Sequence, residues 1–106
     1  MPFIVVLVTT PSENEALKIV NKLLEEKLIA CANIIEKVHS KFWWHKKVED
    51  SYESLVIMKT HSKLFNELTR TVKKLHSYEV PEIIALSIAQ GSASYLDWIR
   101  ASIRKV

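Results

Sequence analysis

The side chains of this sequence that could do chemistry are few and widely spaced. They are one cysteine, four histidines and a polar segment: Cys31, His39, His45, His61, His76 and residues 77–82. A thiolate combined with an imidazole favours copper or zinc over magnesium or calcium. None of these side chains has the spacing of metal ligands within one element, such as i and i+4 on a helix. A metal site would therefore have to be assembled by the fold or between subunits.

Each candidate also has a structural explanation, which the sequence leaves open. Cys31 lies in a run of small apolar residues, where a buried free thiol is the usual outcome. His76 is predicted at the end of a helix, where an imidazole can donate to the last carbonyl groups. If a hairpin closes through residues 45–47, His39 lies opposite Glu53, and that pair stabilises a sheet. No nucleophile, base and orienting group form a set, so we expect no enzyme.

Composition argues against several other functions. The chain has 106 residues, 48% of them hydrophobic, and one glycine, whereas phosphate-binding loops and dinucleotide-binding turns need several. The net charge of +3 comes from interleaved basic and acidic residues, so we expect no nucleic-acid partner. One cysteine cannot form an intrachain disulfide, and the longest apolar run, residues 3–8, is too short to span a membrane. We expect a cytoplasmic protein with no organic cofactor.

These side chains must be positioned by the elements that the hydrophobic pattern predicts. Residues 3–9 form a continuous apolar run, rich in β-branched side chains, which is typical of a buried strand. Ser12 and Glu15 have the spacing of a capping box, and the apolar residues that follow recur with the period of a helix over residues 13–27. The chain is short enough that we expect one domain over residues 1–106.

The second half of the chain also has hydrophobic patterns typical of helices and strands. These patterns predict a helix that ends near His76, a strand over residues 82–89 and a short C-terminal helix. The predicted caps are Thr60 or Ser62 for the first of these helices and Ser92 or Ser94 for the last. With a hairpin in the middle, the order is βαββαβ plus one helix. This order is typical of an α+β, ferredoxin-like fold, in which two helices cover one face of an antiparallel sheet.

The hairpin predicted over residues 33–44 and 48–60 is long for so small a domain. At about 3.3 Å per residue, its first strand reaches about 40 Å, whereas a compact domain of this length has a diameter of about 34 Å. The tip carries three adjacent aromatic residues, Phe42, Trp43 and Trp44. Patches of that size rarely stay exposed on soluble monomers, so we predict a homo-oligomer. The alternative is a bulge or bend that folds the tip back onto its own core.

Several motifs, in order along nearly the whole chain, strongly resemble those of the CutA divalent-cation tolerance family. They are Val6-Leu7-Val8-Thr9-Thr10-Pro11, Ala30-Cys31-Ala32-Asn33, Phe42-Trp43-Trp44, Met58-Lys59-Thr60, His76-Ser77-Tyr78-Glu79-Val80-Pro81-Glu82 and Tyr95-Leu96-Asp97-Trp98. The resemblance implies a ferredoxin-like subunit, similar to the PII signalling proteins, that assembles into a homotrimer through its long hairpin. It also implies a role in tolerance of copper and other divalent ions.

The resemblance further implies where a ligand would bind. The metal ligands would be Cys31 and His76, with Lys59, Tyr78 and Glu79 as neighbours in a cleft between subunits. We therefore expect a non-enzymatic, trimeric protein that binds copper or a similar divalent ion. The alternative is a PII-like regulatory module that binds a small metabolite in the clefts between subunits.

Three positions depart from the family pattern. His45-Lys46 replaces the usual pair in the hairpin turn, and Ser77 stands where a proline usually follows the histidine. Val8 stands where some members have a second cysteine. A copper site rich in thiolates is therefore not expected, and the affinity for metal should be modest.

Overall fold

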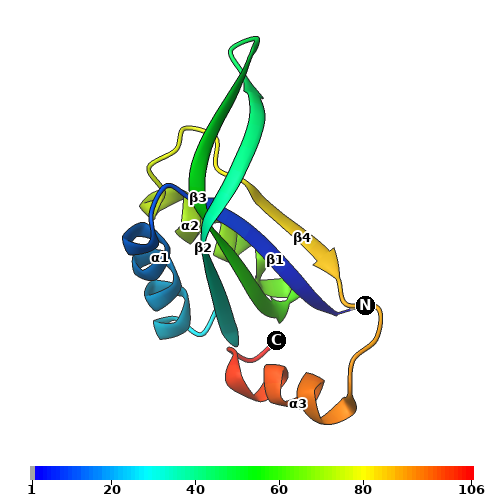
Figure 1. Ribbon diagram of the computed structural model, residues 1–106. Helices are drawn as coiled ribbons and strands as arrows, with labels where there is room; N and C mark the ends of the chain where they lie inside the picture. The colour runs from blue at the N-terminus through cyan, green and yellow to red at the C-terminus, as the bar shows by residue number, and fades with distance from the viewer. Residues whose placement is uncertain (1) are drawn as a thin grey trace.

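The computed structural model describes residues 2–106. Four strands form one sheet, and three helices accompany it. The elements are β1 (Phe3–Thr10), α1 (Glu13–Glu25), β2 (Cys31–Trp44), β3 (Lys47–His61), the 3-10 turn η1 (Ser62–Leu64), α2 (Phe65–Leu75), β4 (Ile83–Ser87) and α3 (Ala93–Ser102). All pairings are antiparallel, in the order β2-β3-β1-β4. The α+β, ferredoxin-like order with an additional C-terminal helix is confirmed (Figure 1). Among the described residues, no helix is long and apolar enough to cross a membrane.

Helices α1 and α2 cover one face of the sheet and form the core with it. The buried side chains of this layer include Val6, Val8, Val56 and Met58 from the strands and Ile19, Leu23, Leu68 and Val72 from the helices. They alternate along each strand, because successive side chains of a strand point to opposite faces. In Figure 1, α2 lies behind the sheet and α3 crosses below one end of it.

The opposite face, which we call the open face, is largely apolar. The strand register gives it Val5, Leu7, Ile35, Leu55, Ile57, Ile84 and Leu86. Leu7 pairs with both Ile57 and Ile84, so these side chains form one continuous surface rather than scattered contacts. Ile84 is 50% exposed and Leu86 is 54% exposed. A contiguous apolar surface of this kind commonly marks an interaction site on a soluble protein.

Helix α1 ends two residues before the predicted boundary. Lys27 adopts the left-handed conformation, with φ of 56°. Its N–H donates to the carbonyl of Leu24, and the N–H of Leu28 donates to the carbonyl of Leu23. This pair of bonds is a Schellman motif, which satisfies the last carbonyl groups and stops the helix. At the other end, Ser12 Oγ accepts from the N–H of Glu15, as predicted.

The predicted cap of the second helix is wrong. Thr60 lies inside β3, which continues to His61, and its buried hydroxyl donates to the carbonyl of Leu28 at 2.7 Å. Ser62 lies inside η1, which is capped by the ring of His61, accepting from the N–H of Lys63 at 3.1 Å; α2 itself has no side-chain cap. The last helix is capped by Ser92, one of the two predicted residues.

His61 should make the fold sensitive to mild acid. Burial, and then the nearby charges of Arg100 and Lys63, lower the pKa of this histidine below its ordinary value. The unfolded chain therefore takes up a proton at a higher pH than the folded chain does. The contribution of the neutral His61 ring to the free energy of unfolding is complete above about pH 6.5. This contribution is lost as the pH falls through the pKa of His61 in the folded protein. We expect a lower urea midpoint at pH 5 than at pH 7.5, and a smaller difference in His61→Gln. Equal pH dependence in both proteins would contradict this assignment.

Strands β2 and β3 meet in a two-residue turn, because Trp44 pairs with Lys47. His45 and Lys46 both have positive φ, 50° and 64°, as a type I′ turn requires. This tight turn shifts the pairing of the hairpin by one residue relative to a turn through residues 45–47. The predicted pairing of His39 with Glu53 is therefore wrong: His39 pairs with Tyr52 and stacks on it, with ring centroids 4.7 Å apart.

A β-bulge interrupts the regular alternation of side chains along β2. Ile35 pairs with Leu55 and Val38 pairs with Glu53, so Glu36 and Lys37 oppose a single residue of β3. Lys37 has φ of 59°. Bulges increase strand twist and reverse which side chains share a face. The side chains beyond the bulge therefore lie on the opposite face from the one that uninterrupted alternation would give them.

The hairpin extends beyond the rest of the domain, as predicted from its length. The longest dimension of the chain is 44 Å, against 26 and 22 Å for the other two. Figure 1 shows the tip projecting away from the helices and from β4. Trp43 is 73% exposed, and Phe42 and Trp44 are also exposed. The tip does not fold back onto its own core, which removes the alternative to an overhanging hairpin.

A glycine in place of Lys46 should stabilise the hairpin, whereas a glycine in place of the neighbouring Lys47 should destabilise it. At Lys46 the positive φ suits glycine, so Lys46→Gly should raise the free energy of unfolding by about 0.5–1 kcal/mol. Lys47 lies in a strand, where glycine should cost about 0.5–1 kcal/mol. Urea unfolding of the two variants provides the comparison. Shifts of the same sign would contradict the type I′ turn.

Candidate functional site

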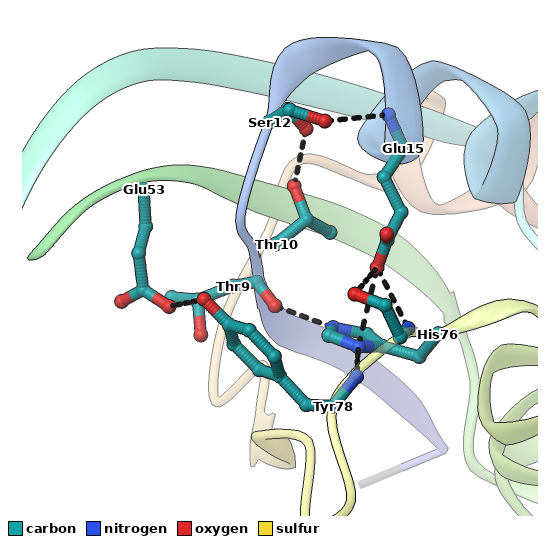
Figure 2. A network of polar contacts seen from close by, with 8 residues as sticks. Thr9, Thr10, Ser12, Glu15, Glu53, His76 and Tyr78 are labelled. Carbon is teal, nitrogen blue, oxygen red and sulfur yellow. Dashed lines mark hydrogen bonds and ion pairs between the residues drawn. The ribbon is translucent and has the colours of Figure 1, made fainter.

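His76 lies directly after α2 with its side chain fully buried, and both ring nitrogens form hydrogen bonds. Nε2 lies 2.7 Å from the carbonyl oxygen of Thr9, which can only accept, so Nε2 carries the proton. Nδ1 lies 3.0 Å from the backbone nitrogen of Tyr78 and accepts from its N–H. Figure 2 shows the imidazole bridging these two segments. These two contacts fix the orientation of the ring and place a proton on Nε2.

Glu15 of α1 holds the same loop from the other side. Its Oε2 accepts from the backbone N–H of Ser77 at 3.0 Å and from the Ser77 hydroxyl at 3.1 Å. The same oxygen lies 3.3 Å from His76 Nδ1. Because the carboxylate of Glu15 is used here, the predicted capping box is only half formed. The His76 side chain thus joins the loop after α2 to β1, and the Glu15 side chain joins the same loop to the start of α1.

Tyr78 extends this set of contacts to β3. Its hydroxyl donates to Glu53 Oε2 at 2.7 Å, and Glu53 is only 7% exposed (Figure 2). Burial, and then the hydrogen bond and charge of Glu53, raise the pKa of Tyr78. Burial and the charge of Glu53 also raise the pKa of Glu82. We call the connected residues Thr9, Glu15, Glu53, His76, Ser77 and Tyr78 the His76 network.

Cys31 lies elsewhere, at the start of β2 on the open face. It is partly buried and opposes Lys59 in the strand register. Its Sγ lies 3.7 Å from the hydroxyl oxygen of Tyr95 on α3. The hydrogen bond with Cys31, and then burial, raise the pKa of Tyr95. Lys59 Nζ donates to Asn33 Oδ1 at 2.6 Å, which completes a polar cluster at this end of the open face.

The two predicted metal ligands do not meet within one subunit. Cys31 is level with Lys59, whereas Thr9, which holds His76, is level with Leu55. Four residues of strand separate these levels, about 13 Å, and β3 lies between β1 and β2. No group of three histidine, cysteine or carboxylate side chains in residues 2–106 is arranged to hold a metal ion.

The other predicted site residues divide between these two places and the tip. Lys59 lies beside Cys31, and Tyr78 lies beside His76. Glu79 is exposed on the loop that follows α2. The aromatic residues predicted for a subunit interface, Phe42, Trp43 and Trp44, form the exposed end of the hairpin.

The sequence did not predict that Glu15 and Glu53 belong to the His76 network. It predicted a helix cap at Glu15 and a pair with His39 at Glu53. One signal was present: Glu15 lies four residues before Ile19 and one before Ala16, so it falls on the buried stripe of α1. A carboxylate on such a stripe needs an internal partner.

Comparison with known proteins gives one consistent result. Residues 4–102 match the family described as CutA1 divalent ion tolerance protein. The chain is 47% identical over 96 residues to the divalent-cation tolerance protein CutA of Thermus thermophilus, covering 91% of this chain and 93% of that protein. It is 42% identical over 105 residues to protein CutA 1, chloroplastic, of Oryza sativa, covering 99% of this chain.

The chain spans 59% of the length of that rice protein. A solved structure of CutA1 from Oryza sativa superimposes with a TM-score of 0.95 at 42% identity, covering 100% of this chain and 97% of that chain. The similarity therefore includes the long hairpin and the C-terminal helix as well as the sheet.

Proposed function

The chain belongs to the CutA1 divalent ion tolerance protein family, and from this premise we propose that it is a non-enzymatic, cytoplasmic homotrimer that binds copper or a similar divalent ion. Family membership is the observation that supports a role in cation tolerance. The open face and the overhanging hairpin support the assembly. In a trimer, surfaces of two subunits lie next to each other. Cys31 of one subunit and His76 of another could then contribute to the same metal site.

Both edges of the sheet support assembly into a ring. Strand β2 pairs only with β3, and β4 pairs only with β1, among the residues that the structure describes. Unpaired edges are sites where a strand of another chain can add. A hairpin that overhangs its own subunit can lie along the neighbouring subunit, and repetition of a head-to-tail contact closes a ring. The apolar side chains of the open face would then be buried.

In this proposal Cys31 is the principal metal ligand and His76 contributes from another subunit. Cys31 is partly buried, but its thiol lies at a polar cluster with Tyr95 and Lys59 on the face that assembly would cover. His76 could coordinate only through Nδ1, after the N–H of Tyr78 turns away. Lys59, Tyr78 and Glu79 would line the cleft. Copper affinity should therefore depend more on Cys31 than on His76.

Calorimetric titration of copper tests this assignment. Cys31→Ser should weaken binding at least tenfold, because a hydroxyl replaces the soft thiolate ligand. His76→Gln should weaken it less. His45→Gln is the matched control, since it makes the same substitution at an exposed histidine of the hairpin turn and should leave the affinity unchanged. Equal copper affinity in Cys31→Ser and the wild type would remove Cys31 from the site.

A further inference from the structure

A groove between α1 and α2 carries positive charge that neither the core nor the proposed metal site uses. It lies on the helical layer, which covers the face of the sheet opposite the open face. Its volume is about 260 Å³. The polar residues that line it are Lys22, Glu26, Glu67, Arg70, Thr71 and Lys74.

The two glutamates of the groove are already paired. Lys22 Nζ lies 3.2 Å from Glu26 Oε2, and the guanidinium of Arg104 donates to Glu67 Oε2 at 2.7 Å. Arg70 and Lys74 form no ion pair with any residue in 2–106. These two residues are four positions apart on α2, so they lie on the same side of the helix. The groove therefore presents two uncompensated positive charges.

We propose that the α1–α2 groove binds the dianionic phosphate group of a phosphate monoester. A guanidinium can bind two phosphate oxygens at once, an ammonium adds a point charge, and the Thr71 hydroxyl can donate a further hydrogen bond. The groove is slightly smaller than pockets that enclose drug-sized ligands, which suits a phosphate group with a small substituent. Two uncompensated cations match one dianionic phosphate group, whereas a nucleic acid presents many phosphates along an extended backbone, so the groove does not fit a nucleic acid.

The test titrates the folded wild-type protein with inorganic phosphate and, separately, with a short peptide that carries one phosphoserine, at constant ionic strength set with sodium chloride. The test variant is Arg70→Gln/Lys74→Gln. The matched control is Lys63→Gln/Lys73→Gln, which removes the same charge from exposed residues of η1 and α2 outside the groove. Circular dichroism confirms that all proteins are folded.

We expect the wild type and the control to bind at least one probe, and the test variant to bind it at least tenfold more weakly. The tighter probe identifies whether the phosphate comes from a free molecule or from a modified peptide. No binding of either probe by the wild type, or equal binding by the test variant, would overturn the proposal. Native mass and copper affinity should be the same in all three proteins, so failure here is separable from failure of the proposed function.

Discussion

Replacing His76 by alanine should lower the free energy of unfolding by about 2–4 kcal/mol. The imidazole is fully buried and satisfies the carbonyl of Thr9 and the N–H of Tyr78. Its removal leaves both groups without a partner and opens a cavity, and each unsatisfied buried group costs about 1–3 kcal/mol. Urea unfolding at fixed protein concentration measures the loss.

Ser77→Ala is the matched control for this substitution. Ser77 is exposed, and the change removes only its hydroxyl bond to Glu15 while the backbone bond remains. We expect a loss of less than about 1 kcal/mol. If His76→Ala were no more destabilised than Ser77→Ala, the His76 network would not be what joins the loop to β1 and α1.

Replacing Leu86 by glutamate should dissociate the proposed trimer. Leu86 is 54% exposed in one subunit, so a charge there should cost the isolated subunit little. In an interface that covers the open face, however, the same carboxylate would be buried without a partner, which is strongly unfavourable. We expect the mass in solution to fall from three subunits to one.

The control makes the same substitution on the helical layer. Leu17 on α1 is 41% exposed, close to the exposure of Leu86, but it lies on the side that the proposed assembly leaves free. Leu17→Glu should leave the mass unchanged. Light scattering at the same micromolar concentration compares the two variants. Dissociation of both, or of neither, would show that the open face is not the assembly surface.

The fold was predictable because its signals are local and repetitive. The apolar run at the start gives β1, and the helical period after Ser12 gives α1 to within two residues. The length of the hairpin, compared with the diameter of a small domain, gives the overhang. Each of these follows from backbone geometry and from burial of one face, so one sequence is sufficient.

Details that depend on positive φ were not predictable. His45-Lys46 forms a tight turn without the asparagine or glycine that usually signals it, and Lys37 forms a bulge without glycine. The turn moved the partner of His39 from Glu53 to Tyr52. Sequence pattern cannot identify such positions when the residues there carry no conformational preference for them.

The candidate site was only partly predictable, for a different reason. His76, Tyr78 and Cys31 were identified as residues that carry chemistry, but their partners are remote in sequence. The carbonyl of Thr9 that holds His76 is 67 residues away, and the Tyr95 hydroxyl near Cys31 is 64 residues away. A backbone carbonyl also has no residue identity to recognise, so the role of Thr9 required the structure.

We propose that this chain acts as a closed assembly of three copies, with the open face covered. Native mass of the unmodified chain at micromolar concentration is the decisive measurement. A closed assembly of three copies should give a single species of three times 12.2 kDa. A species of 12.2 kDa under the same conditions would contradict the trimer, the covered open face and a metal site shared between subunits.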